Sequence, residues 1–255
     1  MFIAAGNAQL FAISFGQGPR SLLALGGWAG SWEVWADTLA VLSRTWRAAG
    51  YDHRGTGVTV APVESITIEA MVADVFTVMD ALALNRSVLA AESAGAMIAL
   101  LAVLAQPERF SGLVIVDGLI HSPRPDAPTP FARGLRANFE ATLNSFVELC
   151  VPEPDSEAIK RWGRQILRRS EPAAAIRLHE LTHGVDLRPR VHEIELPTLI
   201  IHGDADALVP LSEAEWLAGR LPQARLHVVP GGGHVPTVTR PAEVAAAIEA
   251  YFPSS

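Results

Sequence analysis

Short apolar runs alternate along this chain with longer stretches in which apolar residues recur every three or four positions. The short runs predict strands, and the longer stretches predict amphipathic helices. Leu113-Val114-Ile115-Val116 is apolar at every position, as expected for a strand that helices cover on both faces. Because strands and helices alternate, the pattern favours βαβ units, a mostly parallel sheet and hence an α/β fold. The segment Phe2–Phe15, which contains Gly6-Asn7, instead indicates an antiparallel hairpin.

One segment after the strand Leu113–Val116 interrupts this alternation. It begins with the proline-rich stretch Ser122–Pro130 and continues as helical sequence. We therefore expect a core formed by residues 1–117 and 191–255, with a helical insertion at 118–190 that lies over the ends of the strands. Within the insertion, helices are predicted at Phe131–Val151, Ser156–Arg169 and Ala173–Thr182.

The composition narrows the class of protein. The chain has 255 residues, of which 49% are hydrophobic and 18% charged, so it is too apolar to be disordered. Its one cysteine, Cys150, excludes a disulfide scaffold and a multi-thiolate zinc site. The net charge of −7 argues against nucleic acid as a partner, because binding phosphates needs a basic face.

Neither a membrane span nor a signal peptide is expected. The longest apolar run, Ala94–Ala105, is shorter than the roughly 18 residues that cross a bilayer. Met1–Pro19 lacks both the positive charge and the apolar core of a signal peptide. We therefore expect a cytoplasmic protein. The sequence does not predict its oligomeric state.

Ser93 is the first candidate for chemistry. The sequence Ala91-Glu92-Ser93-Ala94-Gly95 follows an apolar strand and begins an apolar helix, which is the setting of a nucleophile elbow. A sharp turn there would lift Ser93 Oγ out of the sheet, and the N–H of Ala94 would face a developing oxyanion. A serine that merely caps a helix gives the same local pattern, so this motif does not decide the matter alone.

Two further residues follow later strands. Asp206 lies in a loop after the apolar run Thr198–Ile201, and His234 follows three glycines after Leu226–Val229. The chain order Ser93, Asp206, His234 is that of an α/β-hydrolase catalytic triad.

With these residues the sequence resembles the α/β-hydrolase superfamily over nearly its whole length. Asp206 lies in the family's Gly-x-x-Asp-x-x-x-Pro pattern and His234 in its Gly-x-x-His pattern. Gly26-Gly27-Trp28 resembles the oxyanion loop, with Gly26 where the family has histidine and Trp28 at the donor position. At the elbow, Ala91 replaces the usual glycine. The resemblance implies an eight-stranded sheet flanked by helices, with residues 118–190 forming a cap.

A further match is the turn Asp52-His53-Arg54-Gly55-Thr56-Gly57, which resembles the family's Asp-x-Arg-Gly-x-Gly motif. Its role in the family is structural. The residues themselves indicate the same, with glycines for the turn and a local pair of Asp52 and Arg54.

Other residues compete for some of these roles. Asp204 lies two positions before Asp206, and Asp117 ends the strand after the nucleophile, where some members of the family carry their acid. Glu92 is expected to point away from the chemistry. His53, His202 and His227 are expected at strand ends as packing or hydrogen-bonding residues. None of them has a metal-ligand spacing, so neither a metal nor another cofactor is expected.

The resemblance implies a serine hydrolase acting on a small-molecule acyl substrate. His234 would deprotonate Ser93, Asp206 would orient His234, and the N–H groups of Trp28 and Ala94 would bind the oxyanion. The predicted substrate is a small ester, with lactones and thioesters included. The alternatives are an acyltransferase, a ligand-binding homologue without catalysis, and a hydrolase that cleaves carbon–carbon bonds of ring-cleavage products. Arginines that could bind a carboxylate in the last case are Arg124, Arg133, Arg136 and Arg177.

The insertion is expected to set specificity while the core sets reactivity. Its apolar residues recur at spacings of three and four, so one helix face is apolar. That face either packs on the core or forms a roof over Ser93. A roof would favour medium-sized apolar or aromatic acyl groups. The pocket residues predicted on this basis are Phe131, Leu135, Phe139 and Phe146.

Overall fold

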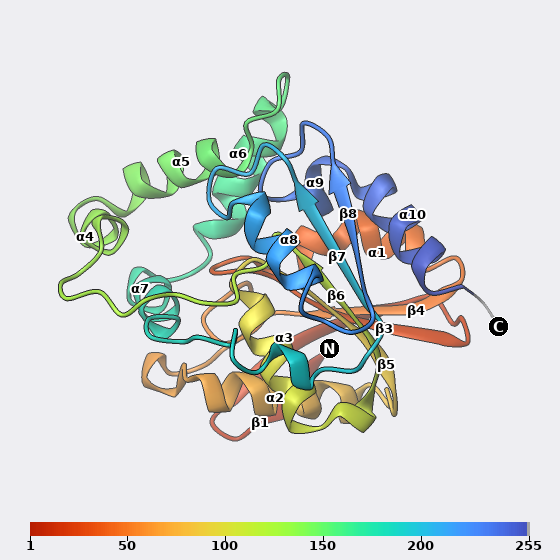
Figure 1. Cartoon of the computed structure of the whole chain (residues 1–255). Helices are drawn as coiled ribbons and strands as arrows, with labels where there is room; N and C mark the ends of the chain where they lie inside the picture. The colour runs from red at the N-terminus through yellow and green to blue at the C-terminus, as the bar shows by residue number, and fades with distance from the viewer. Residues whose placement is uncertain (254–255) are drawn as a thin grey trace.

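The computed structural model describes residues 1–253, and a sheet of eight strands forms its centre (Figure 1). The strands are β1 (Phe2–Ala5), β2 (Ala8–Phe15), β3 (Arg20–Leu25), β4 (Trp46–Tyr51), β5 (Ser87–Glu92), β6 (Phe110–Val116), β7 (Thr198–Gly203) and β8 (Ala224–Val229). Their order in the sheet is β1-β2-β4-β3-β5-β6-β7-β8. β1 and β2 form the predicted antiparallel hairpin, β2 is antiparallel to β4, and the other neighbouring pairs are parallel. The predicted fold class is confirmed.

Helices cover both faces of this sheet (Figure 1). They are α1 (Ala36–Leu42), α2 (Ile68–Ala81), α3 (Gly95–Ala105), α8 (Leu211–Ala218), α9 (Pro236–Thr239) and α10 (Pro241–Tyr251), with short 3-10 turns at Trp32–Trp35, Val63–Ser65, Pro107–Arg109 and Val191–Glu193. Because successive side chains of a strand point to opposite faces, Leu23 and Leu25 of β3 pack in one core cluster and Leu22 and Ala24 in the other. The first cluster includes residues of α2, α3 and α8, and the second includes residues of α1 and α10.

Four helices lie between β6 and β7 in the chain: α4 (Pro130–Ala137), α5 (Phe139–Cys150), α6 (Glu157–Leu167) and α7 (Pro172–Leu181). We call them, with their connections, the α4–α7 segment. They lie at the end of the sheet to which the parallel strands point (Figure 1). The single helix predicted at Phe131–Val151 is wrong, because Asn138 divides it. The Asn138 side chain accepts the N–H of Ala141 at 3.0 Å and so caps α5.

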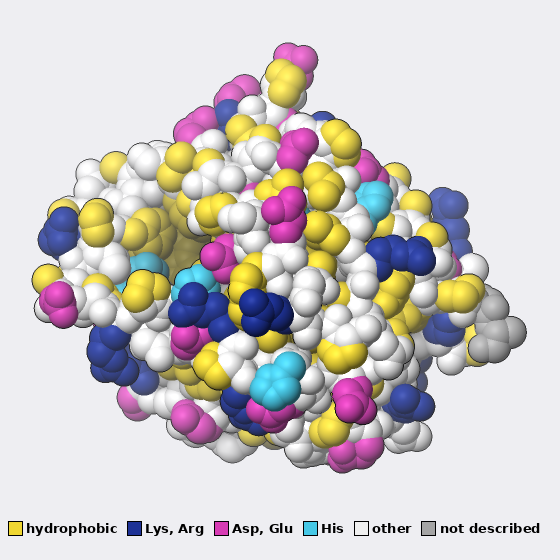
Figure 2. Space-filling view, viewed as in Figure 1, with side chains coloured by type: hydrophobic (Ala, Val, Ile, Leu, Met, Phe, Trp, Pro, Cys, Tyr) yellow, Lys and Arg dark blue, Asp and Glu magenta, His cyan; other side chains and the backbone are white. Residues whose placement is uncertain are grey.

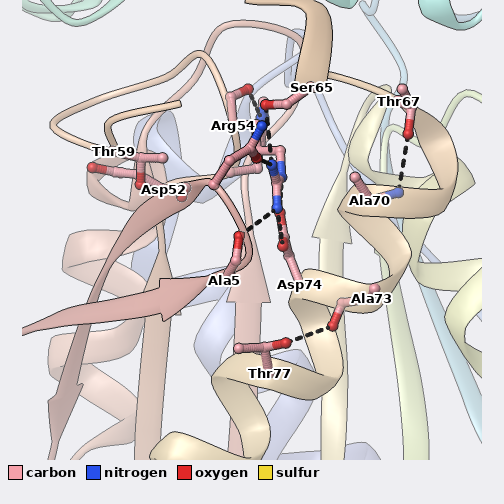
Figure 3. A network of polar contacts seen from close by, with 12 residues as sticks. Ala5, Asp52, Arg54, Thr59, Ser65, Thr67, Ala70, Ala73, Asp74 and Thr77 are labelled. Carbon is pink, nitrogen blue, oxygen red and sulfur yellow. Dashed lines mark hydrogen bonds and ion pairs between the residues drawn. The ribbon is translucent and has the colours of Figure 1, made fainter. Parts of the chain in front are cut away.

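The turn after β4 differs from its prediction, because Asp52 does not pair with Arg54. Asp52 instead accepts the backbone N–H groups of Trp32 at 2.8 Å and Val58 at 2.9 Å. Arg54 donates to both carboxylate oxygens of Asp74 in α2, at 2.7 and 2.9 Å, and to the carbonyl of Ala5 (Figure 3). The buried ion pair therefore connects α2 to this turn, and the hydrogen bond to Ala5 connects β1 to it.

None of the helices in residues 1–253 is long and apolar enough to cross a membrane.

Candidate active site

Ser93 lies on the sharp turn between the end of β5 and the start of α3. Its φ is +50°, in the left-handed region that residues other than glycine rarely adopt. Two hydrogen bonds hold this strained conformation. The N–H of Ser93 donates to the carbonyl of Val116 at 2.9 Å, and the carbonyl of Ser93 accepts the N–H of Leu119 at 3.0 Å. The turn directs the serine side chain out of the sheet at the carboxyl end of β5.

Glycines around Ser93 allow the backbone to pass close to it. A Cβ atom on Gly95 would lie 2.4 Å from the carbonyl oxygen of Gly26, and one on Gly27 would lie 2.9 Å from Ser93 Cβ. Larger residues at these two positions would force the elbow and the loop after β3 apart. Ala91, where the family usually has glycine, is fully buried and packs in the core, so its methyl group fits.

The structure brings Ser93, His234 and Asp206 together. His234 Nε2 lies 2.8 Å from Ser93 Oγ, and His234 Nδ1 lies 2.7 Å from Asp206 Oδ2. The three residues come from the turn after β5 and the loops after β8 and β7, which are all at the carboxyl edge of the sheet. With Nδ1–H donating to the carboxylate, Nε2 is free to accept the serine proton.

Asp206 is held as a carboxylate. Its Oδ1 accepts the N–H groups of Leu208 at 2.7 Å and Val209 at 3.1 Å. Burial alone would raise the pKa of Asp206, but the hydrogen bond and charge of His234, with these two N–H groups, outweigh burial and hold the pKa below its ordinary value. The side chain can therefore orient the imidazole and stabilise its charged form.

The two competing acids take other positions. Asp204 is exposed and accepts the N–H of Gly231 at 2.6 Å. Asp117 is fully buried and accepts the N–H of Gly203 at 2.9 Å. Burial and the neighbouring Asp206 carboxylate raise the pKa of Asp117 well above its ordinary value, which favours its neutral form. Within residues 1–253, only Asp206 of these three hydrogen-bonds to His234.

The loop after β3 passes beside Ser93 and is anchored at two points. His53 Nε2 donates to the carbonyl of Gly27 at 2.9 Å, and the indole Nε1 of Trp28 donates to the carbonyl of Ala175 in α7 at 2.7 Å. In the part of the chain that the structure describes, the backbone N–H groups of Trp28 and Ala94 donate to no protein acceptor. Both N–H groups can therefore donate to another acceptor.

Two cavities meet at Ser93, and Trp28, Ser93, Phe146 and His234 line both of them. The first has a volume of about 70 Å³, and we call it the α6 cavity; its wall includes Val147, Ile159, Trp162, Ile166 and Leu167. The second has a volume of about 390 Å³, and we call it the α7 cavity; its wall includes Leu119, Phe131, Leu149, Leu178 and His179. Figure 2 shows a hollow lined with hydrophobic side chains between α4, α5 and α7, where the α7 cavity lies.

The four predicted pocket residues separate into two pairs. Phe131 and Phe146 line the α7 cavity, and Phe146 also lines the α6 cavity. Both rings contact Trp28 edge-on, with centroids 4.8 and 5.1 Å from the indole. Leu135 and Phe139 line neither cavity and pack into the core instead. The apolar residues of α4 and α5 therefore do both things that the sequence left open: some pack on the core and others line the cavities at Ser93.

Comparison with known proteins identifies the family. The family model described as "Serine aminopeptidase, S33" matches residues 29–238 of this chain. The chain belongs to this family of α/β-hydrolases. The predicted superfamily and the prediction of an enzyme are thereby confirmed.

Relatives of this hydrolase match along nearly all of its length. It is 29% identical to a pimeloyl-[acyl-carrier protein] methyl ester esterase of Nitrosomonas europaea, over 95% of this chain and 99% of the relative. It is 30% identical to a putative carbamate hydrolase RutD of Caulobacter vibrioides, over 88% of this chain and 87% of the relative. An esterase from Exiguobacterium antarcticum has the same fold, with a TM-score of 0.91 at 22% identity over 98% of both chains.

Glu92 lies nearer to the site of this hydrolase than the sequence suggested. It is buried and lines the α6 cavity, where Thr237 Oγ1 donates to its Oε2 at 2.7 Å. Burial raises the pKa of Glu92 to about 7. Its own hydrogen bond is to Thr237, as expected for a carboxyl that is not part of the serine–histidine pair. The sequence signal that could have revealed this is the place of Glu92 next to Ser93, at the end of a strand that is apolar at Val88–Ala91.

The arginines that could have bound a substrate carboxylate are engaged elsewhere. Arg136 pairs with Glu180, and Arg177 donates to the carbonyl of Ile66 at 2.9 Å. Arg133 donates to the carbonyl of Pro128 at 2.6 Å, and Arg124 lines a separate surface pocket. Neither cavity at Ser93 has an arginine in its wall among the described residues.

One group of side chains has donors suited to a metal ion. Single ligand atoms of Asp117, His202 and Asp206 lie within 4.8 Å of one another. No metal spacing was apparent in the sequence, because the sheet brings these residues together from two different strand ends. Asp206 already binds His234 and two N–H groups, so a cation there would compete with the contact that orients His234.

Proposed function

We propose that this hydrolase cleaves small-molecule carboxylic esters through a covalent acyl-enzyme on Ser93. The observation that carries the proposal is the pair of contacts made by His234, 2.8 Å to Ser93 Oγ and 2.7 Å to Asp206 Oδ2. An imidazole held between a hydroxyl and a carboxylate can take the hydroxyl proton while the carboxylate stabilises the resulting charge.

The first half of the reaction transfers the acyl group to the enzyme. Ser93 Oγ attacks the ester carbonyl as its proton moves to His234 Nε2. The carbonyl oxygen becomes an oxyanion between the N–H groups of Trp28 and Ala94, each of which contributes about 3–4 kcal/mol to such stabilisation. Collapse of the intermediate breaks the bond to the alcohol, which leaves with the proton from His234.

Water completes the cycle. His234 now takes a proton from water, whose oxygen attacks the acyl-enzyme carbonyl. The second oxyanion occupies the same two N–H groups, and its collapse releases the acid and returns the proton to Ser93 Oγ. These steps use only side chains and backbone of the chain itself, without a cofactor.

The shape of the site supports esters with apolar groups on both sides of the carbonyl. The two cavities share Ser93 but have otherwise largely different walls, and aromatic and aliphatic side chains form most of both walls. We propose that the α4–α7 segment is a cap that selects the substrate, with Phe146 dividing the two groups of the ester. The relatives named as a methyl ester esterase and as a putative carbamate hydrolase both support a carbonyl substrate.

Cleavage of carbon–carbon bonds is less well supported, because the four candidate arginines lie outside both cavities. Acyl transfer would use the same three residues with an alcohol, amine or thiol in place of water. The cytoplasmic location expected from the sequence stays a prediction.

The test is steady-state hydrolysis of chromogenic esters and carbamates of increasing acyl length. The wild-type chain should turn over at least one series, and Ser93→Ala should lose turnover while keeping the melting temperature of the wild type. A folded Ser93→Ala variant with wild-type activity would refute the proposal. Activity that appears only when an alcohol, amine or thiol is added would replace hydrolysis with acyl transfer.

A further inference from the structure

The loop that carries His234 has little rigidity of its own. Gly231, Gly232 and Gly233 precede the histidine, and glycine gives the backbone more freedom than any other residue. Yet His234 Nε2 must stay within hydrogen-bonding distance of Ser93 Oγ for the proton to move. Contacts from outside the loop must therefore fix its position.

One set of contacts comes from the loop after β7. Asp204 Oδ1 accepts the N–H of Gly231 at 2.6 Å, and the N–H of Ala205 donates to the carbonyl of Gly232 at 2.9 Å. We call Gly231–Gly233 the glycine loop. These two bonds hold its first half against the loop that follows β7.

The second set comes from the end of α5 and the residues that join it to α6, within the α4–α7 segment; we call residues 150–156 the α5–α6 turn. The carbonyl of Cys150 accepts the N–H of His234 at 2.8 Å, and Glu153 Oε1 accepts the N–H of Gly233 at 2.9 Å. The approach is so close that a Cβ atom on Gly233 would lie 2.3 Å from Pro152 Cδ. The α5–α6 turn therefore contacts the half of the loop that is adjacent to the histidine.

Glu153 is an unusual residue for this position. It is only 5% exposed, and the N–H of Gly233 is the only hydrogen-bond donor to its carboxyl group in residues 1–253. Its second oxygen, Oε2, is buried without a partner. Ser156 Oγ donates to the Glu153 carbonyl and so stabilises the turn itself. Burying a carboxyl group with one donor is costly, so stability alone does not account for it.

We propose that Glu153 is a positioning residue, which fixes the glycine loop so that His234 stays aligned with Ser93. The α4–α7 segment would then contribute to reactivity as well as to specificity, whereas the sequence assigned reactivity to the core alone. This inference rests on the proposed role of His234 as the base. It concerns alignment rather than binding, because Glu153 lines neither cavity at Ser93.

The test compares three substitutions with one control. Glu153→Ala removes the acceptor, Glu153→Asp withdraws it by one methylene group, and Glu153→Gln keeps an amide oxygen that can accept the same N–H. The control is Glu148→Ala in α5, which removes an exposed carboxylate paired with Lys160 and Arg164 but leaves the glycine loop untouched. Two measurements are made on each: hydrogen exchange of the 230–236 peptide, and kcat and KM for a small ester.

We expect Glu153→Ala to speed exchange in the 230–236 peptide and to lower kcat about 10- to 100-fold with little change in KM. The exchange rate and kcat of Glu153→Asp should lie between those of Glu153→Ala and the wild type. Glu153→Gln and Glu148→Ala should resemble the wild type in both measurements. If Glu153→Ala does not fold, the contrast between Glu153→Asp and Glu153→Gln gives the answer.

Unchanged exchange and kcat in Glu153→Ala and Glu153→Asp would overturn the inference, as would an equal loss in Glu148→Ala or in Glu153→Gln. The exchange measurement does not depend on turnover. A wild-type chain without esterase activity would therefore refute the proposed function, while exchange would still decide whether Glu153 fixes the loop.

Discussion

The hydroxyl oxygen of Ser93 lies 2.8 Å from Nε2 of His234, although 141 positions separate the two residues in the chain. The parallel sheet explains how they meet, because the strands that precede them, β5 and β8, end at the same edge. Ligands of open α/β sheets bind at this edge. The reactive pair and the two cavities therefore belong to one site.

The acid partner of His234 can be tested by comparing Asp206→Asn with Asp204→Asn. An amide at position 206 would no longer stabilise the imidazolium or select its tautomer, with losses of up to about 10⁴ in kcat known for such a change. An amide at position 204 keeps an acceptor for the N–H of Gly231, so its effect should be small. The measurement is kcat/KM of both variants. The opposite order would make Asp204 the acid, and two mild effects would point to Asp117.

Glu92 should make stability depend on pH. Burial raises its pKa from 4.5 to about 7, so the folded chain binds this proton more tightly than the unfolded chain does. The free energy of unfolding should therefore fall as pH rises from about 4.5 to about 7. Glu92→Gln keeps an acceptor for Thr237 but cannot ionise.

Urea titrations of both proteins across this pH range give the comparison. From the low to the high end of this pH range, the free energy of unfolding of Glu92→Gln should rise by about 1–3 kcal/mol relative to that of the wild type. Because the other titrating groups are common to both proteins, their contributions cancel to first order. Parallel stability profiles would show that Glu92 keeps an ordinary pKa in the folded chain.

The wall between the two cavities should determine which esters react fastest. Phe146 lines both cavities, so Phe146→Ala should enlarge them and change the relative rates among esters of different acyl size. Labelling by a small fluorophosphonate should change much less, because that probe occupies little of either cavity. Phe139→Ala is the matched control from the same helix, since Phe139 lines neither cavity.

Steady-state rates for a series of esters, divided by the labelling rate, measure this effect. One common factor for all esters in Phe146→Ala would mean that the residue is only structural. A change in relative ester rates in Phe139→Ala would mean that Phe139 also contacts the substrate.

Much of the fold and of the site could be predicted because their signals are local. Buried strands such as Leu113–Val116 are continuous apolar runs, and glycines mark the turns that carry Ser93 and His234. Each reactive residue follows its own strand, and parallel strands bring such positions to one edge. The meeting of Ser93, Asp206 and His234 could therefore be predicted without knowing any side-chain geometry.

What the sequence could not reveal depends on packing between distant segments. Arg54 pairs with Asp74 in α2 rather than with Asp52 two positions away, because backbone N–H groups occupy Asp52. The direction of each residue on the apolar face of α5 is set by the neighbouring helices, which is why Phe139 and Phe146 differ. The hydrogen bond from Gly233 to Glu153 spans 80 positions and has no counterpart in a local motif.

The measurement that tests the central claim most directly is rapid-quench mass spectrometry of the chain mixed with an activated ester. During the first turnovers, one acyl group should appear on the peptide that contains Ser93 and should disappear as the substrate is consumed. Ser93→Ala should carry no adduct, and His234→Ala should form it far more slowly. Ester turnover without an adduct, or an adduct on another residue, would contradict the account.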